Sequence, residues 1–216
     1  MKVIINCAIS LNGKLATVKG DSSLSDREDL IRVHKLRAEV DAVAVGGRTV
    51  KIDNPHLTVR YVPGKNPVRV IIDGDGILSS IPSDAHILDN SAPTLIYTTE
   101  AGLSRYSEYI RRKGVIVAGR DYIKISDILR DLAQKKIKTL LVEGGGTLIW
   151  SFISERFVDE INVAICPVIL GGAKAVTLAD GIGFPSVKKA LHLKLRKTQT
   201  TKTGIIIASY DVEQDG

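Results

Sequence analysis

The sequence is poor in the residues that build disulfide frameworks and metal sites. Its 216 residues include two cysteines and four histidines, scattered along the chain. Cys7 and Cys166 fall inside apolar, strand-like segments, and buried reduced thiols are the expected state of such isolated cysteines. The H-E-x-x-H motif and the H-x-E with P-C-x-x-C pattern of zinc deaminases are also missing. We therefore expect no catalytic metal.

Aromatic residues and long hydrophobic runs are scarce as well. Aromatics make up 5% of the chain, which leaves few rings for stacking nucleobases. The net charge of +6 is spread along the chain. Such a charge suits a nucleic acid, a phosphate-bearing small molecule or no ligand at all. No apolar run approaches the ~20 residues that cross a bilayer, and the first residues do not resemble a signal peptide. We expect a cytoplasmic protein with no membrane or nucleic-acid partner.

Three motifs of nucleotide-binding and hydrolytic enzymes are absent from the sequence. There is no G-x-x-x-x-G-K-[ST] loop, no G-x-G-x-x-G fingerprint and no G-x-S-x-G elbow. Any chemistry is therefore expected to use an organic cofactor or no cofactor.

Apolar runs of strand length alternate with helix-like segments along most of the chain. Strands are expected at residues 3–10, 41–45, 67–73, 94–98, 115–117 and 139–142, and helices after residue 25 and at 102–112, 126–136 and 147–157. Ser25 and Glu28 form a candidate capping box for the first helix. This order predicts an α/β fold, with a mainly parallel sheet and helices on both faces, in one domain over residues 1–216.

The C-terminal part follows a different pattern. Residues 191–196 alternate between leucine and polar side chains, which predicts a strand with one solvent-exposed face. A turn at 201–204 and a second strand at 205–210 complete an expected antiparallel hairpin at the edge of the sheet.

Glycines follow two of the expected buried strands. Gly46 and Gly47 precede Thr49, and Glu143 is followed by three glycines and Thr147. Such glycines let an anionic ligand approach the backbone, and the next helix offers its first N–H groups. The carboxyl ends of parallel strands are where ligands bind, so both segments are expected to line one cleft. The alternative is that these glycines only make tight turns, as we expect for Gly171 and Gly172.

Several of these segments together resemble the riboflavin-biosynthesis reductases. Residues 10–16 (SLNGKLA) resemble the family's S-L-D-G-K-x-A opening, with Asn12 in place of the commoner aspartate. Residues 34–60 resemble its H-x-L-R…D-N-P-x-L-T-V-R block, and residues 141–150 its V-E-G-G-x-x-L signature. Residues 167–172 and 181–184 resemble its P-x-x-x-G-G and G-x-G-F elements. The match is collinear over nearly the whole chain.

This resemblance implies a dihydrofolate-reductase-like fold, NADPH as hydride donor and a homodimer. The implied substrate is 2,5-diamino-6-ribosylamino-4(3H)-pyrimidinone 5′-phosphate, which is reduced at the ribosyl C1′ to a ribitylamino product. In some lineages a zinc deaminase precedes this reductase in one chain. Because the zinc motifs are missing here, the implied type is the stand-alone reductase, which acts on the still-aminated pyrimidine.

The resemblance also implies roles for individual residues. The implied cofactor positions are Ala16, Thr49, Asp53, Ser79, Ser80, Ile81, Pro82, Gly144, Gly145, Gly146 and Thr147. The implied substrate positions are Lys14, Arg37, Leu57, Arg60 and Glu143. Asp53 and Glu143 are the candidate catalytic groups. The simpler alternatives are a turn carboxylate for Asp53 and surface charges for the arginines and lysine.

Three other functions remain as alternatives. A dihydrofolate reductase would share the fold and cofactor, although Arg37, Arg60 and Glu143 suit a phosphoribosyl aminopyrimidine better. A basic nucleic-acid-binding protein would bind DNA or RNA in a salt-sensitive way and ignore NADPH. A regulator built on the same fold would bind NADPH and turn nothing over.

Overall fold

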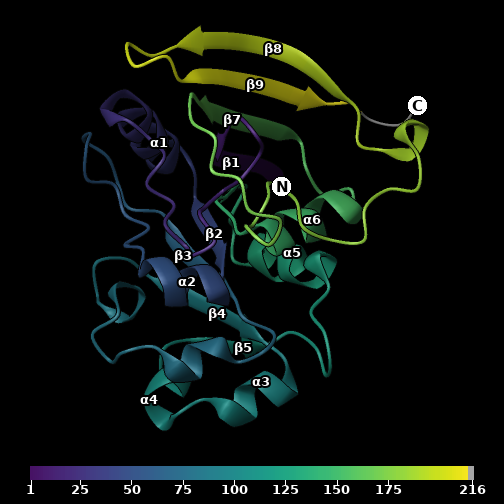
Figure 1. The fold of residues 1–216 in the computed structure, drawn as a ribbon. Helices are drawn as coiled ribbons and strands as arrows, with labels where there is room; N and C mark the ends of the chain where they lie inside the picture. Colours follow the sequence, from purple (N-terminus) through teal and green to yellow (C-terminus); the bar gives the residue numbers. More distant parts are fainter. Residues whose placement is uncertain (214–216) are drawn as a thin grey trace. The chain divides into compact units, whose positions relative to one another are not determined.

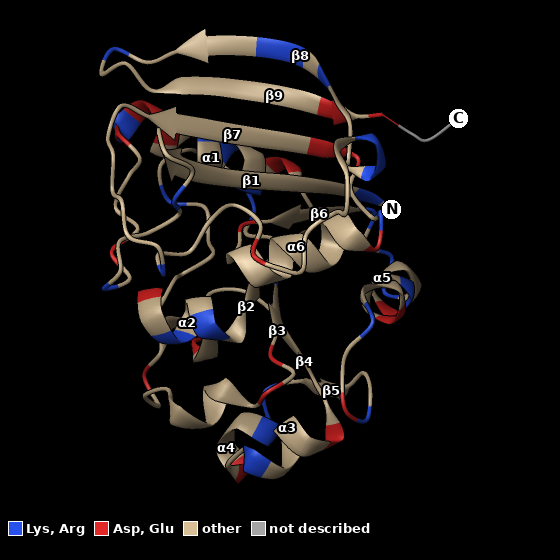
Figure 2. Cartoon of the chain, turned by 45° about the vertical axis from the view of Figure 1, so that its right-hand side comes forward, with Lys and Arg blue, Asp and Glu red and all other residues tan. Residues whose placement is uncertain are grey.

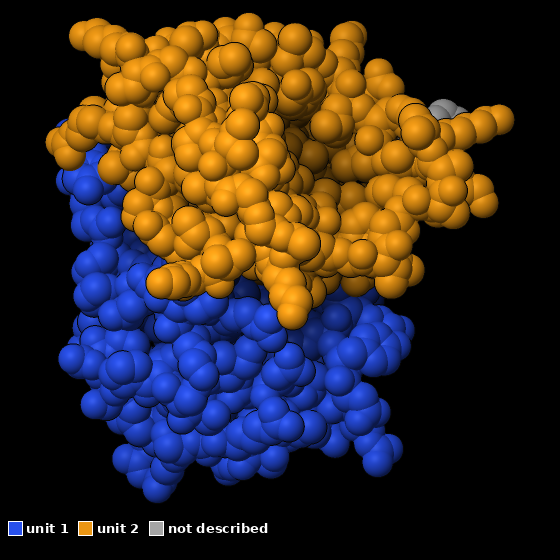
Figure 3. Space-filling model, viewed as in Figure 1, with its two compact units in different colours: residues 1, 34–141 blue, residues 2–33, 142–216 orange. Residues whose placement is uncertain are grey.

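The computed structural model describes residues 1–213 and divides into two compact units (Figure 3). Unit 1 contains residue 1 and residues 34–141, and unit 2 contains residues 2–33 and 142–213. The prediction of one domain over residues 1–216 stays a prediction, and residues 214–216 lie outside the described residues. No helix of the described residues is long and apolar enough to cross a membrane.

Unit 1 is built on parallel strands (Figure 1). Their order is β5-β4-β3-β2, with β6 next to β2. The bounds are β2 (Ala42–Gly46), β3 (Val68–Ile72), β4 (Thr94–Thr98), β5 (Val115–Val117) and β6 (Thr139–Val142). Their aliphatic, mostly β-branched residues are largely buried, as expected for strands of a parallel sheet. The predicted parallel strands are confirmed.

The helices of unit 1 follow its strands. They are α2 (Gly47–Asp53), α3 (Glu100–Arg105), α4 (Glu108–Arg111) and α5 (Ile125–Gln134), with the 3-10 turns η1 (Ile77–Ser80) and η2 (His86–Leu88). In α5, Ile125, Ile128 and Leu132 are buried at helical spacing.

The continuous helix predicted at residues 102–112 is wrong. Helix α3 ends at Arg105, because the backbone of the next residue, Tyr106, is extended with φ −75° and ψ 137°. The Tyr106 hydroxyl donates to the buried Asp73 carboxylate at 2.6 Å. Ser107 then caps α4, because its hydroxyl accepts the N–H of Ile110. A distant hydrogen bond and a new cap therefore divide a segment that has helical periodicity.

Helix α1 (Arg27–Glu39) confirms the first predicted helix, but its cap differs from the prediction. The Asp26 carboxylate accepts the N–H of Asp29 at 2.7 Å, so Asp26 rather than Ser25 caps the helix. The Ser25 hydroxyl donates to the fully buried Asp29 carboxylate at 2.5 Å instead. The predicted capping box of Ser25 and Glu28 is therefore wrong, because the buried Asp29 needs the Ser25 hydroxyl as a partner.

Unit 2 combines a parallel strand pair with an antiparallel hairpin. Strand β1 (Lys2–Ser10) runs parallel to β7 (Glu160–Cys166), and β9 (Ile206–Val212) and β8 (Leu193–Thr200) follow in antiparallel order. Helix α6 (Gly146–Ser154) and the turn η3 (Val187–Lys189) complete the unit. The predicted mixed α/β fold with a C-terminal antiparallel hairpin is confirmed.

The two thiols are buried and free, as predicted. Cys166 packs with Ala164, Ile205 and Ile207 in the core of unit 2. Burial raises the pKa of the Cys7 thiol to about 12 and that of Cys166 to about 11, so both stay protonated at neutral pH.

The prediction that the strand at residues 191–196 has one buried and one solvent-exposed face is wrong. All eight residues of β8 are exposed, including Leu195 at 53%, because β8 is the outer strand of the hairpin.

Gly171 and Gly172 have φ of +65° and +79°, which agrees with the plain turn expected there.

A buried carboxylate ties the hairpin to the first strand of unit 2. Figure 2 shows the basic stretch of β8 beside the acidic ends of β7 and β9. Glu160 on β7 accepts from Lys2 at 2.9 Å, Asn162 at 3.0 Å and both terminal nitrogens of Arg196. Arg196 also pairs with Asp211 at 3.2 Å. Burial alone raises the pKa of Glu160, but these donors lower it to about 2.

Replacing Glu160 is expected to change how stability depends on pH. The pKa of Glu160 is lowered from 4.5 to about 2, so its stabilising effect is complete above pH 4.5 and is lost as pH falls toward 2. Between pH 6 and pH 3 the wild type should lose about 2 kcal/mol more unfolding free energy than Glu160→Gln. Denaturant unfolding at each pH measures this. The exposed Glu213→Gln should follow the wild type, and parallel curves for wild type and Glu160→Gln would contradict the account.

Candidate functional site

The carboxyl ends of the strands in unit 1 meet at one edge. Gly46 pairs with Ile72, Ile72 with Tyr97, and Thr98 with Val117, so β2 to β5 end level with one another. The segments that follow these strands therefore share this edge, which is where open parallel sheets bind ligands.

Two predicted cofactor segments lie at this edge. Helix α2 follows β2 and packs against η1, which follows β3. Thr49 and Asp53 lie on α2 one turn apart, so their side chains share a face of the helix. Ser79 and Ser80 end η1 and are exposed, with Ile81 and Pro82 directly after them. The structure thus brings together Thr49, Asp53 and the 79–82 segment.

The three predicted substrate residues of unit 1 gather around residues 54–60, which we call the α2–β3 loop. Arg37 donates from Nη1 to the Thr58 carbonyl at 3.2 Å. The N–H of Arg60 donates to Nδ1 of His34 at 2.8 Å. Leu57 is buried and has φ +54°, a left-handed value that is uncommon for a branched side chain. Such backbone persists where its surroundings hold it, and it concentrates at binding sites.

Sequence reasoning missed a buried carboxylate at the same edge. Asp73 follows β3 directly and accepts the N–H of Ile77 at 2.9 Å, the N–H of Leu78 at 2.8 Å and the Tyr106 hydroxyl. Burial, followed by the hydrogen bond to Asp73, raises the pKa of Tyr106 well above its usual value. The signal in the sequence was a carboxylate directly after a buried strand, a position that Asp73 shares with Glu143.

In unit 2, Lys14 and Ala16 lie in the loop after β1. The Lys14 ammonium donates to the Ala175 carbonyl at 2.8 Å, and Leu15 donates its N–H to Val176 at 2.9 Å. The N–H of Asp180 donates to the Gly146 carbonyl at 3.1 Å. Residues 175–180 therefore connect the loop of Lys14 and Ala16 to the first residue of α6.

The start of α6 has the features of an anion site. Glu143 is half-buried directly after β6, and Gly144 has φ +116°. Gly145 is the N-cap, makes no side-chain cap hydrogen bond, and is followed by Gly146 and the exposed Thr147. The first N–H groups of a helix have no partner within the helix, so this end suits a phosphate group.

Two of the glycines have a packing role that the sequence did not reveal. A Cβ at Gly47 would lie 2.4 Å from Oδ1 of Asp73. One at Gly146 would lie 2.4 Å from the Thr177 carbonyl oxygen and 2.7 Å from Oδ2 of Asp180. Gly46 differs, since its Cβ would meet only the Ile72 carbonyl oxygen, at 4.0 Å. The glycine that begins each helix is therefore required by close neighbours in its own unit, which are the Asp73 side chain for Gly47 and the Thr177 carbonyl with the Asp180 carboxylate for Gly146.

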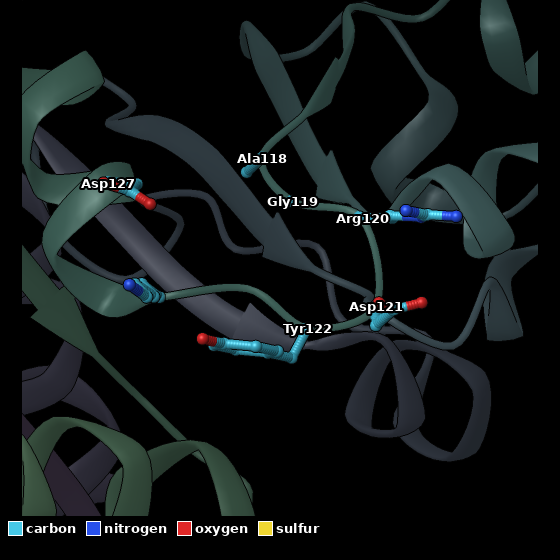
Figure 4. Close-up of a pocket in the computed structure, with 7 residues that line it drawn as sticks. Ala118, Gly119, Arg120, Asp121, Tyr122 and Asp127 are labelled. Atoms are coloured by element: carbon cyan, nitrogen blue, oxygen red, sulfur yellow. The ribbon is translucent and has the colours of Figure 1, made fainter.

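The predicted residues thus form two groups, one in each unit. Unit 1 holds Arg37, Thr49, Asp53, Leu57, Arg60, Ser79, Ser80, Ile81 and Pro82, and unit 2 holds Lys14, Ala16, Glu143, Gly144, Gly145, Gly146 and Thr147. A separate hollow of unit 1, between β5 and α5, is lined by Ala118, Gly119, Arg120, Asp121, Tyr122, Lys124 and Asp127 (Figure 4). None of the predicted residues lines this hollow.

A matched pair of alanine substitutions tests the packing role of Gly47. Gly47→Ala should lower the free energy of unfolding by about 1–3 kcal/mol, because the new methyl group overlaps the Asp73 carboxylate. Gly46→Ala should cost less than about 1 kcal/mol, since the space is open and only a neutral cap is changed. Thermal and denaturant unfolding measure both. Equal costs for the two variants would show that the Asp73 contact is not what requires glycine.

Comparison with known proteins identifies the family. The RibD C-terminal domain model matches residues 1–207. Two proteins named 2,5-diamino-6-ribosylamino-4(3H)-pyrimidinone 5′-phosphate reductase are similar over most of their length. The one from Aquifex aeolicus is 43% identical, covering 90% of this chain and 89% of that protein. The one from Methanothermobacter thermautotrophicus is 41% identical, covering 95% of each.

Solved structures agree with this assignment. A Thermotoga maritima diaminohydroxyphosphoribosylaminopyrimidine deaminase/5-amino-6-(5-phosphoribosylamino)uracil reductase superimposes with a TM-score of 0.79 at 27% identity. The match covers 98% of this chain but 56% of that longer one. A pyrimidine reductase-like protein from Corynebacterium diphtheriae shares the fold, with a TM-score of 0.84 at 21% identity over 99% of this chain and 92% of that one. The chain therefore belongs to the RibD C-terminal domain family.

Proposed function

We propose that this chain is a reductase of riboflavin biosynthesis. It reduces the ribosyl C1′ of 2,5-diamino-6-ribosylamino-4(3H)-pyrimidinone 5′-phosphate to the ribitylamino product, and residues 1–216 act as one reductase domain. The observation that carries the proposal is the correspondence, along at least 89% of each relative, with two proteins named for this reaction.

We propose NADPH as the cofactor. When bound, NADPH would supply the hydride. Its phosphates would lie at the start of α6, where Gly144, Gly145, Gly146 and Thr147 offer backbone N–H groups. Thr49 and Asp53 would contact it from one face of α2, and Ser79, Ser80, Ile81 and Pro82 would lie beside its adenosine phosphate. Ala16 would lie near the nicotinamide.

The substrate would be held by charged side chains. Arg37 and Arg60 suit its 5′-phosphate, because a guanidinium binds two oxygens at once. Glu143, at the end of a buried strand, suits a pyrimidine amino group. Lys14 already donates to the Ala175 carbonyl, so its role would be to add positive potential. Asp53 and Glu143 remain the candidates for proton transfer.

A homodimer in the cytoplasm is also part of the proposal. In the apolar stretch at 163–170, Val163 and Ala164 are buried within unit 2, whereas Ile169 is 71% exposed. Leu193, Leu195 and Ile206 of the hairpin are also exposed apolar side chains that could lie in an interface. Sedimentation velocity should give the mass of a dimer, and a monomer at micromolar concentration would contradict this part.

Reduced-nicotinamide absorbance tests the reaction. Purified protein with NADPH and the diaminopyrimidine ribosyl phosphate should consume NADPH, whereas dihydrofolate in place of that substrate should not. Consumption with dihydrofolate would favour a dihydrofolate reductase. Binding of NADPH without consumption would favour a regulator, and salt-sensitive binding of DNA without NADPH binding would favour a nucleic-acid-binding protein.

Alanine variants in the same assay separate the two sets of residues. Arg37→Ala and Arg60→Ala should raise KM for the pyrimidine about 10- to 100-fold, which is the effect of losing one charged hydrogen bond. Thr49→Ala and Asp53→Ala should raise KM for NADPH instead. Exposed Arg112→Ala serves as the control. If all four variants affect both constants equally, the assignment of residues to ligands is wrong.

A further inference from the structure

A buried arginine fixes the segment of residues 86–92. Arg69 lies on β3 with no exposed surface. Its guanidinium donates to the carbonyl oxygens of His86 at 2.8 Å, Asp89 at 2.8 Å and Ala92 at 2.7 Å. It also pairs with the Asp89 carboxylate at 2.9 Å. Because several donors of one rigid group hold this segment, the sheet itself sets the backbone position of His86.

His86 makes two hydrogen bonds to the residue that ends α2. Its N–H donates to Oδ1 of Asn54 at 2.9 Å, and its Nδ1 lies 2.7 Å from the Asn54 carbonyl oxygen. A carbonyl oxygen only accepts, so Nδ1 carries the proton in this contact. Asn54 is the C-cap of α2 and has the left-handed φ of +40°. His86 therefore holds the backbone where the α2–β3 loop begins.

The same imidazole also contacts the loop at a second point. The rings of His56 and His86 stack with centroids 3.5 Å apart and planes 15° apart. Burial, with the charge of Arg60 and the neighbouring His86 and Arg69, lowers the pKa of His56, while Asp89 opposes this. His56 is therefore uncharged at neutral pH.

Leu57 follows this stack directly. Its positive φ needs support from outside the loop, and the contacts of His86 at Asn54 and His56 supply such support on one side. Asn66 supports the loop conformation further along the chain. Its Oδ1 accepts the N–H of Val59 at 2.8 Å, and its Nδ2 donates to the Ser91 carbonyl at 2.9 Å. The 86–92 segment thus supports the loop at both of its ends.

We propose that His86 is a positioning residue for the substrate. Through its Nδ1–H bond to the Asn54 carbonyl it keeps the α2–β3 loop, with the buried Leu57, in the conformation that places Arg60. The inference rests on the proposed function, which gives Arg60 to the substrate. His86 itself acts through Asn54.

Two substitutions separate the hydrogen bond from the ring stack. His86→Asn keeps an N–H donor near the place of Nδ1 and loses the stack. His86→Phe keeps an aromatic ring that can stack on His56 and loses the donor. We expect His86→Phe to raise KM for the pyrimidine about tenfold, as for one lost hydrogen bond, with kcat and the Kd of NADPH within about threefold of wild type. His86→Asn should stay within about threefold of wild type in all three constants.

Hydrogen exchange supplies a readout independent of turnover. The amides of residues 54–60 should exchange about tenfold faster in His86→Phe than in wild type, and His86→Asn should restore their protection. The inference is overturned if His86→Phe matches wild type in KM and exchange, or if His86→Asn is as impaired as His86→Phe. It is also overturned if kcat falls while KM is unchanged. A wild type that never consumes NADPH with the pyrimidine would refute the proposed function instead, and exchange alone would then decide whether His86 holds the loop.

Discussion

Buried charged side chains need hydrogen-bonding partners, and this requirement determines the conformation of the loops of unit 1. Strand β3 carries Arg69 inside it and Asp73 directly after it, and both side chains are buried. A buried charge without partners costs several kcal/mol, so each must be surrounded by hydrogen-bonding groups. Arg69 finds them in the carbonyls of the 86–92 segment, and Asp73 finds them in the N–H groups of η1. One strand thereby orders the loops on which several of the proposed binding residues depend.

Unit 2 follows the same principle with other residues. Glu160 collects donors from β1, β7 and β8, and so fixes the hairpin to the strand pair. Asp180 accepts the N–H and hydroxyl of Thr177, and its carboxylate lies against Gly146 at the start of α6. In each unit a carboxylate thus lies beside the first residue of a helix that follows a strand. Negative charge is favourable at that end of a helix, because the helix dipole is positive there.

The sequence predicted those parts of the fold that depend on local pattern. The buried strands and α5 carry the periodicity of their element, so residues such as Ile128 and Leu132 mark the inner face without knowledge of the rest. The break at Tyr106 had no local signal, because its cause is a hydroxyl bonded to Asp73, far away along the chain. The exposure of β8 also had no local signal, because the same alternation of leucine and polar residues occurs in an outer strand and in a strand with one covered face.

The candidate site was predicted mainly through the resemblance to a family, with the strand-end glycines as independent physical support. Asp73 was missed although it carries one signal, a carboxylate directly after a buried strand. His86 was missed because its importance lies in the backbone groups of a distant loop that it contacts, and such contacts leave no pattern in the sequence. The contact of Asp73 with Gly47 has a consequence for the design of variants. A side chain at position 47 would occupy the space of the Asp73 side chain, so the two residues cannot be chosen independently. A library that varies both together should yield folded variants with a side chain at position 47 only where the residue at position 73 has become smaller. The two positions should therefore covary.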